Sequence, residues 1–328
     1  MNRRRIGADG PAVGAVGLGC MSFGGFYGPT DERESHATLK RAIDLGIDHL
    51  DTADGYGSGV SEQVIGSFLR QNPSARFHIA TKGGIVHKPV RSFNNRPDYL
   101  REALEGSLRR LGRDHVELYY IHRRDQSVPV EDVIGTLVRF KEEGKIGAIG
   151  LSEISPATLE RAQAVHPIAA VQSEYSLWTR LPELGLLQAC KRRRTALVAF
   201  SPVGRGIFAD KLPDPARFRE GEFRAANPRF QEPNWSYNAR RIAAFNDFAR
   251  EQGFAPAALA IAWVLSRGEH VIAIPGTRSG DHLEQDAAGA SIALTPEMID
   301  RIEELLPVGF AHGDRYSDAQ AVGPERYC

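Results

Sequence analysis

Four polar side chains that could act together on a carbonyl group follow three successive apolar runs of the sequence. Asp51 ends the run 47–51, and Tyr56 stands five residues later in the stretch DTADGYGSGVSE. Lys82 ends the next run and His122 ends the one after it. The glycines of the stretch let the backbone turn tightly and approach a ligand closely. A solvated turn in which Tyr56 covers the core would account for the stretch equally well on its own.

The charge of Lys82 could make Tyr56 an effective acid and base. A free tyrosine has a pKa near 10. An ammonium about 4 Å away, at an effective dielectric constant of about 20, favours the phenolate by up to roughly 4 kcal/mol, or about three pK units. Asp51 would keep Lys82 protonated, and His122 would orient a carbonyl or donate a hydrogen bond to it. Taken singly, these residues have simpler explanations. Lys82 and Asp51 could form a purely structural ion pair, and His122 could be a hydrogen-bonded histidine of the core.

Such side chains meet only if the fold brings the ends of successive strands together. Eight short apolar runs are predicted strands: Ala15–Gly19, Ile47–Asp51, Phe77–Lys82, Val116–His122, Ile146–Ser152, Ile168–Gln172, Ala196–Ser201 and Val271–Pro275. Helix signals between them include a cap at Asp31 with a stop at Gly46, Pro97-Asp98 before Tyr99–Leu111, and the starts Ser155-Pro156 and Thr295-Pro296. The alternation predicts an α/β fold, and eight units fit a closed (β/α)8 TIM barrel whose mouth lies at the C-terminal strand ends.

Two segments depart from this alternation. The segment Arg3–Val13, with Ala8-Asp9-Gly10 at its centre, predicts an N-terminal β-hairpin that could plug the barrel floor. The segment Val203–Ser236, a long loop after the seventh strand, is rich in Gly, Pro, Arg and Phe, and long irregular connections are usually functional flaps. No linker divides the chain, so residues 1–328 are expected to form one domain.

The composition disfavours several classes of function. The 328 residues include 41 basic and 41 acidic side chains, so no overall field attracts nucleic acid or an anionic membrane. Three cysteines (Cys20, Cys190 and Cys328) without CxxC spacing fit a reducing compartment, and no apolar run reaches the ~18 residues of a membrane span. The ten histidines show no metal-binding spacing. The glycines at 17–19 lack the spacing of a Rossmann dinucleotide-binding loop. We therefore expect a soluble, cytoplasmic protein without metal that acts on small molecules.

The chain resembles the aldo-keto reductase family, in its branch of single-domain bacterial, fungal and plant members. The motifs that carry the resemblance are DTADGYGSGVSE, IATKGG, LYYIHRRD, GAIGLSE, AAVQSEYSLW, AFSPVGRG and IPGTR, spread over roughly residues 13–307. The resemblance implies a barrel that reduces aldehydes and ketones with NADPH. It also implies the four roles: Tyr56 donates the proton, Lys82 lowers its pKa, Asp51 supports Lys82 and His122 orients the carbonyl.

The resemblance also implies a cofactor site, and one part of that site departs from the family pattern. The implied residues are Gly19, Cys20, Met21 and Asp51, the carboxamide-binding Ser152 and Gln172, the stacking ring of Phe200, Ser201, Pro202, Gly204, Arg205 and Gly206 at the pyrophosphate, and Gly276, Thr277 and Arg278 at the 2′-phosphate. The family commonly has Arg and then Glu-Asn where this chain has His282, Gln285 and Asp286. A fixed positive charge is thereby lost, so NADPH is expected first, with NADH as an alternative.

The substrate is less well defined than the cofactor. Residues that could line its pocket are Met21, Phe23, Phe26, Tyr27, Arg123, Trp178 and the loop 203–236, which together suggest aromatic or medium-sized carbonyl compounds. Arg123-Arg124 could attract a carboxylate or phosphate of the substrate, or could be an exposed pair of arginines with no specific role in binding. Two other functions stay open: a Schiff-base lyase with Lys82 as nucleophile, and a cofactor-binding regulatory protein that senses redox state. The chain could be a monomer or a homo-oligomer.

Overall fold

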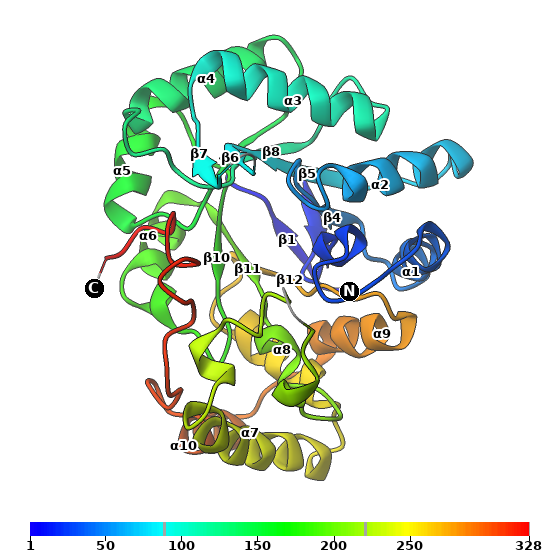
Figure 1. The fold of residues 1–328 in the computed structure, drawn as a ribbon, viewed down its shortest axis with the longest axis vertical. Helices are drawn as coiled ribbons and strands as arrows, with labels where there is room; N and C mark the ends of the chain where they lie inside the picture. Colours follow the sequence, from blue (N-terminus) through cyan, green and yellow to red (C-terminus); the bar gives the residue numbers. More distant parts are fainter. Residues whose placement is uncertain (88–89, 220–221, 328) are drawn as a thin grey trace.

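The computed structural model describes residues 1–328 except 88–89, 220–221 and 328, and it is built around a closed parallel barrel (Figure 1). The barrel strands, in spatial order, are β3 (Leu18–Gly19), β4 (His49–Asp51), β5 (His78–Gly83), β8 (Leu118–Ile121), β9 (Ile149–Ser152), β10 (Ala170–Glu174), β11 (Ala196–Phe200) and β12 (Val271–Ile274). Bridges from Val16 to Ala273 and from Gly19 to Gly276 join the first strand to the last. The expected (β/α)8 barrel is confirmed. Several strands begin or end one to three residues inside the apolar runs that predicted them.

Helices surround the strands on the outside (Figure 1). They are α1 (Glu32–Asp44), α2 (Val60–Gln71), α3 (Pro97–Leu111), α4 (Val130–Glu142), α5 (Pro156–Val165), α6 (Leu186–Arg193), α7 (Asn234–Glu251), α8 (Pro256–Ser266), α9 (Gly280–Ala288) and α10 (Pro296–Leu305). The predicted start signals act as N-caps. The side chains of Asp31, Ser155 and Thr295 each accept a hydrogen bond from the backbone N–H of the residue three positions later. Gly112 ends α3 with φ 66°, a conformation that glycine adopts without strain.

The N-terminal hairpin fills one end of the barrel, as expected. Strands β1 (Arg3–Arg5) and β2 (Ala12–Gly14) pair antiparallel. Ile6 and Val13 are buried with the inward-facing residues of the barrel strands. Arg4 donates a hydrogen bond to the carbonyl of Gly268, just before β12 begins. The hairpin therefore closes the N-terminal end and leaves the C-terminal ends of the strands open.

Three further segments lie over the C-terminal end of the barrel. A short hairpin, β6 (Ile85–Val86) and β7 (Ser92–Phe93), follows β5. In its described residues, the long connection after β11 contains short 3-10 turns until α7 starts at Asn234, slightly earlier than the predicted end of the irregular segment. The chain after α10, red in Figure 1, returns past α6 and α5, where the Glu325 amide donates to the Glu153 carbonyl. Among the described residues, no helix combines the length and apolar character that crossing a membrane requires.

Candidate active site

Strands β4, β5 and β8 bring the four predicted side chains together. Lys82, on β5, is fully buried, and its ammonium forms an ion pair with Asp51 at the end of β4. The same ammonium donates to the Thr52 carbonyl (2.8 Å) and lies 3.2 Å from the Tyr56 hydroxyl. His122 follows β8, and its ring packs edge-on against Tyr56 with 5.7 Å between the ring centroids. Sequence reasoning therefore placed all four in one cluster.

The glycines around Tyr56 allow neighbouring chain segments to approach its loop. A Cβ at Gly24 would lie 2.6 Å from the Gly57 nitrogen, and a Cβ at Gly55 would lie 2.1 Å from Nε2 of His87. Gly57 also has φ 62°, which favours glycine. The stretch is therefore more than a solvated turn: its glycines let the loop after β3 and the hairpin after β5 close around Tyr56.

Burial and charge set the protonation states of the cluster. Burial of the phenol raises the pKa of Tyr56, and the opposing charge of Lys82 only partly offsets this. Burial alone would lower the pKa of Lys82, but the Asp51 carboxylate turns the net direction upward. Burial lowers the pKa of His122 well below its usual range, and the charges of Arg123 and Lys82 lower it further. At neutral pH the cluster therefore holds a phenol, an ammonium and a neutral imidazole.

Lys82 lowers the pKa of Tyr56, as the sequence predicted, but the net direction is upward. The sequence argument did not include the cost of ionising a phenol that is largely removed from water. A raised pKa keeps the Tyr56 proton in place at neutral pH. This state suits a residue that donates a proton.

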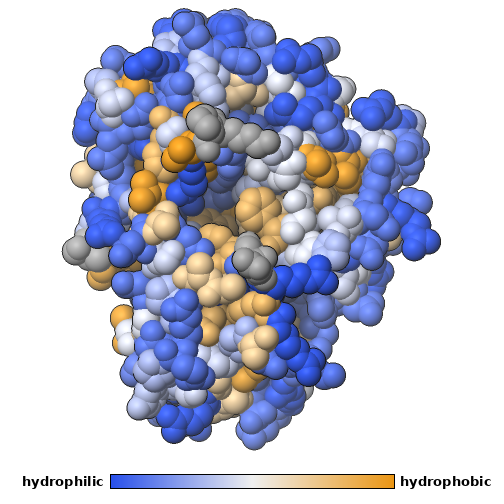
Figure 2. Space-filling view, viewed as in Figure 1, coloured by the Kyte–Doolittle hydropathy of each residue, from blue (hydrophilic) through white to orange (hydrophobic). Residues whose placement is uncertain are grey.

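A cavity of about 1090 Å³ extends from this cluster to the far side of the barrel mouth. Figure 2 shows a hollow near the middle of one face, bordered by apolar residues. The predicted site residues that line the cavity are Gly19, Met21, Asp51, Tyr56, His122, Gln172, Phe200, Ser201, Arg205, Gly206, Gly276, Thr277, Arg278, His282, Gln285 and Asp286. Four predicted cofactor residues are buried outside the cavity lining: Cys20, Ser152, Pro202 and Gly204.

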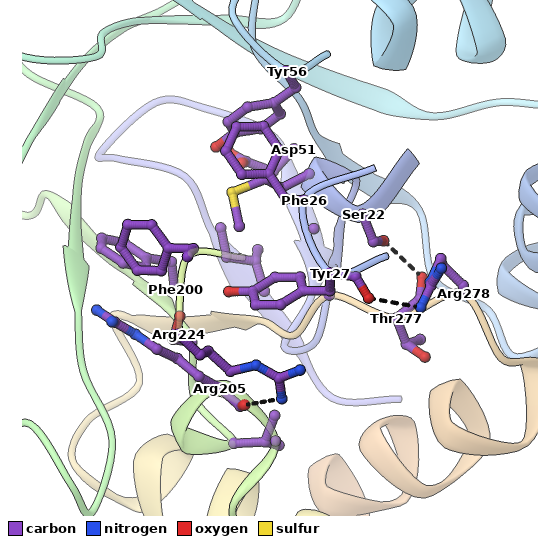
Figure 3. Close-up of a pocket in the computed structure, with 18 of the residues that line it drawn as sticks. Ser22, Phe26, Tyr27, Asp51, Tyr56, Phe200, Arg205, Arg224, Thr277 and Arg278 are labelled. Carbon is purple, nitrogen blue, oxygen red and sulfur yellow. Dashed lines mark hydrogen bonds between the residues drawn. The ribbon is translucent and has the colours of Figure 1, made fainter. Parts of the chain in front are cut away.

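The far end of the cavity lies between β12 and α9. The Arg278 guanidinium donates to the Tyr27 carbonyl (3.0 Å) and has no carboxylate partner among the described residues, while the Ser22 hydroxyl donates to the Thr277 carbonyl (Figure 3). Gln285, one of the residues that depart from the family pattern, donates to Asp210 of the long loop (3.1 Å). Burial raises the pKa of Asp286 to about 8. Its carboxyl group is therefore mostly protonated at neutral pH and does not oppose a phosphate.

The loop after β11 has a backbone typical of anion sites, although its arginine is already paired. Ser201 and Arg205 adopt positive φ angles of 52° and 62°, which are strained for residues other than glycine and cluster at functional sites. The buried Arg205 guanidinium forms an ion pair with Glu174 (2.9 Å) and stacks on Phe223 and Tyr316. The Arg205 carbonyl accepts a hydrogen bond from Arg224 (3.4 Å; Figure 3). Nη2 of Arg205 bonds Glu174, whereas Nη1 has no hydrogen-bond partner among the described residues, so the guanidinium could bind a phosphate oxygen without leaving Glu174.

Some pocket residues were predicted and others were missed. Met21, Phe26, Tyr27 and Arg123 line the cavity, as do parts of the long loop, whereas Phe23 and Trp178 are buried away from it. The lining residues that the sequence did not predict include His87, Arg91 and Tyr316, whereas Arg224 belongs to the long loop that was expected to line the pocket. His87 and Arg91 lie in the hairpin after β5, and Tyr316 lies in the C-terminal segment.

The amino-acid sequence is similar to that of one known protein family. The model of the aldo/keto reductase family matches residues 15–307. Probable aldo-keto reductase 1 of Glycine max is 38% identical over 320 residues, covering 95% of this chain and 91% of that protein. Aldo-keto reductase yakc of Schizosaccharomyces pombe, whose name specifies NADP(+), is also 38% identical over 320 residues, covering 95% and 94%.

Solved structures share the fold over nearly the whole chain. Glycerol dehydrogenase AKR11B4 from Gluconobacter oxydans superposes with a TM-score of 0.84 at 29% identity, covering 93% of this chain and 94% of that one. An aldo/keto reductase from Klebsiella pneumoniae, solved in complex with NADP and acetate, gives 0.72 at 26% identity, covering 97% and 99%. With the family-model match and the 38% identity to two aldo-keto reductases, the chain belongs to the aldo/keto reductase family.

Proposed function

We propose that this protein reduces aldehydes and ketones to alcohols with NADPH, and that Tyr56 donates the proton. The observation that carries the proposal is the position of the Tyr56 hydroxyl, 3.2 Å from the Lys82 ammonium and beside the His122 ring, on the wall of a large cavity. Membership of an oxidoreductase family supports the class of reaction.

The four side chains divide the work on a carbonyl group. A substrate carbonyl oxygen near Tyr56 accepts hydrogen bonds from the Tyr56 hydroxyl and the neutral His122 ring. A reduced nicotinamide, when bound, supplies a hydride to the carbonyl carbon. Tyr56 then gives its proton to the oxygen, and the Lys82 ammonium stabilises the phenolate that remains until solvent reprotonates it. Asp51 keeps Lys82 charged and in place.

Several features of this chain fit NADPH better than NADH. Arg278 is a guanidinium without a carboxylate partner among the described residues, and it lies just before the N-terminus of α9, where the helix dipole favours an anion. Protonated Asp286 adds no opposing charge at neutral pH. The ring of Phe200 also lines the cavity, where the nicotinamide of either cofactor could stack on it, so it does not bear on this choice. The NADP in the names of the Schizosaccharomyces pombe relative and the Klebsiella pneumoniae complex supports the same choice.

The two alternative functions are less well supported. A Schiff-base lyase needs a neutral, accessible lysine, whereas Lys82 is fully buried, paired with Asp51 and has a raised pKa. A regulatory protein that senses redox state would use the same cavity without turnover. Turnover itself therefore separates this second alternative from the reductase.

The direct test is NADPH consumption, followed at 340 nm, with a panel of aromatic and aliphatic aldehydes and ketones. We expect alcohol to form in equal amount to the NADPH consumed, and a KM lower for NADPH than for NADH. NADPH binding without turnover of any substrate would contradict the reductase. Equal KM values for the two cofactors would contradict the NADPH preference alone.

A further inference from the structure

The catalytic end of the cavity carries positive charge without a matching acid. Arg91 and Arg123 both line the cavity at this end. Neither forms an ion pair with any residue that the structure describes: their polar partners are backbone carbonyls and a hydroxyl group. Asp51, the acid of the catalytic cluster, is already paired with Lys82. Two guanidinium groups without an ion pair of their own therefore lie near the place where a substrate would react. Glu153 is the acid whose charge acts on Arg123, but it already pairs with Arg315.

The two arginines differ in burial, and both retain capacity for an anion. Arg123 is 9% exposed; its Nη1 donates to the His122 carbonyl (2.6 Å) and the Ser152 hydroxyl (3.0 Å), while its Nε has no partner. Arg91 is exposed on the hairpin after β5, where it lies over the Phe93 ring and uses Nη1 to contact the Val322 carbonyl. An almost buried charge without a counter-ion is costly, and a bound anion recovers part of that cost.

These arginines lie away from the expected phosphate positions of the cofactor. Arg123 directly follows β8, and Arg91 belongs to the hairpin after β5. The strained loop 201–206 follows β11, and Arg278 follows β12. Two strands, β9 and β10, separate β8 from β11 around the barrel. The two arginines are therefore on the catalytic side, where the substrate would be held. Arg124 does not contribute, because it pairs with Glu325 outside the cavity.

We propose that the substrate is a carbonyl compound that also carries a carboxylate, held by Arg91 and Arg123 while its carbonyl group faces Tyr56. This inference rests on the proposed reductase function and narrows it to oxo-acids. A guanidinium is suited to a carboxylate because its planar donors match the two oxygens. His87, on the same hairpin as Arg91, packs over Gly55 next to Tyr56 and adds a polar wall beside the same space.

A matched pair of substrates tests the proposal: 4-carboxybenzaldehyde and its methyl ester, methyl 4-formylbenzoate. We expect wild-type kcat/KM to favour the acid at least 10-fold, chiefly through KM, and to fall with added salt for the acid only. Arg91→Gln should lower the acid-to-ester ratio of kcat/KM at least 10-fold. Arg96→Gln removes the same charge from an exposed position outside the cavity lining and should leave the ratio unchanged.

Calorimetric titration with benzoate and benzamide gives a readout that does not depend on turnover. Benzoate should bind more tightly than benzamide, and Arg91→Gln should remove the difference. If both aldehydes are reduced equally well and Arg91→Gln does not change their ratio, the oxo-acid inference is wrong while the reductase stands. If no aldehyde is reduced, the reductase proposal fails. In that case, loss of benzoate binding in Arg91→Gln would still support the anion site, and unchanged benzoate binding would contradict it.

Discussion

The protonation of single residues depends on burial that the sequence does not reveal. The residue types and spacing correctly predicted that Asp51, Tyr56, Lys82 and His122 meet, because each stands at or shortly after a strand end of a recognisable barrel. Lys82 lowers the pKa of Tyr56 as predicted, but desolvation of the phenol, which the sequence does not show, outweighs this effect. Asp286 shows the same effect more simply, because burial is the cause of its raised pKa. Solvent exposure comes from the tertiary packing of several distant segments.

Asp286 should make stability depend on pH. Its pKa rises from 3.8 to about 8 on folding, so between these values the folded protein keeps a proton that the unfolded chain has lost. The contribution of Asp286 to stability must therefore fall as pH rises from about 4 to about 8. Asp286→Asn removes this loss and should be more stable than wild type by at least ~1 kcal/mol at pH 8, with the gap shrinking towards pH 4. Urea unfolding across this pH range measures it.

The control for this prediction is Asp300→Asn, which removes an exposed carboxyl group from α10. This variant should follow the wild-type dependence on pH. A stability difference between Asp286→Asn and wild type that stays constant from pH 4 to pH 8 would show that Asp286 titrates normally.

At the scale of elements, a buried ion network ties the C-terminal segment to the strand ends. Arg315 contacts Glu153 after β9 (2.5 Å) and Glu174 on β10 (3.1 Å), and Glu174 also holds Arg205. The charge of the buried Glu153 carboxylate is balanced by Arg315. The sequence predicted the strands and helices well, because apolar periodicity and caps are local signals. It did not predict this network, whose members lie far apart in the chain.

Breaking this network should destabilise the protein. Arg315→Met leaves the Glu153 side chain, which is 1% exposed, without its cation. Removal of one partner from a buried pair costs about 3 kcal/mol, because a buried charge is left uncompensated. Denaturant unfolding should show this loss, and Glu153→Gln combined with Arg315→Met should recover much of it.

The matched control is Arg161→Met, whose ion pair with Glu131 is exposed to solvent. Exposed pairs contribute little, so this variant should unfold close to wild type. Equal losses for Arg315→Met and Arg161→Met would mean that the buried network has no special role in stability.

For the whole molecule, the order of strands determines where chemistry takes place. The hairpin β1–β2 closes the N-terminal end of the barrel, so the cavity can open only at the C-terminal end. Alternating strands and helices predicted this architecture. The lining of the cavity was predicted less well, because Arg91 and Tyr316 reach it from two segments that the sequence did not mark as part of the pocket. The cluster of Asp51, Tyr56, Lys82 and His122 could thus be predicted from the sequence, whereas these lining residues could not.

The central claim is that Tyr56 donates the proton in carbonyl reduction, and Tyr56→Phe tests it most directly. The substitution keeps the ring against His122 and removes only the hydroxyl near Lys82. We predict that kcat falls about 10²–10⁴-fold while the Kd for NADPH stays nearly unchanged. Tyr237→Phe, at an exposed tyrosine on α7, should leave both values as in wild type. A Tyr56→Phe enzyme that retains kcat within about threefold of wild type would contradict the claim.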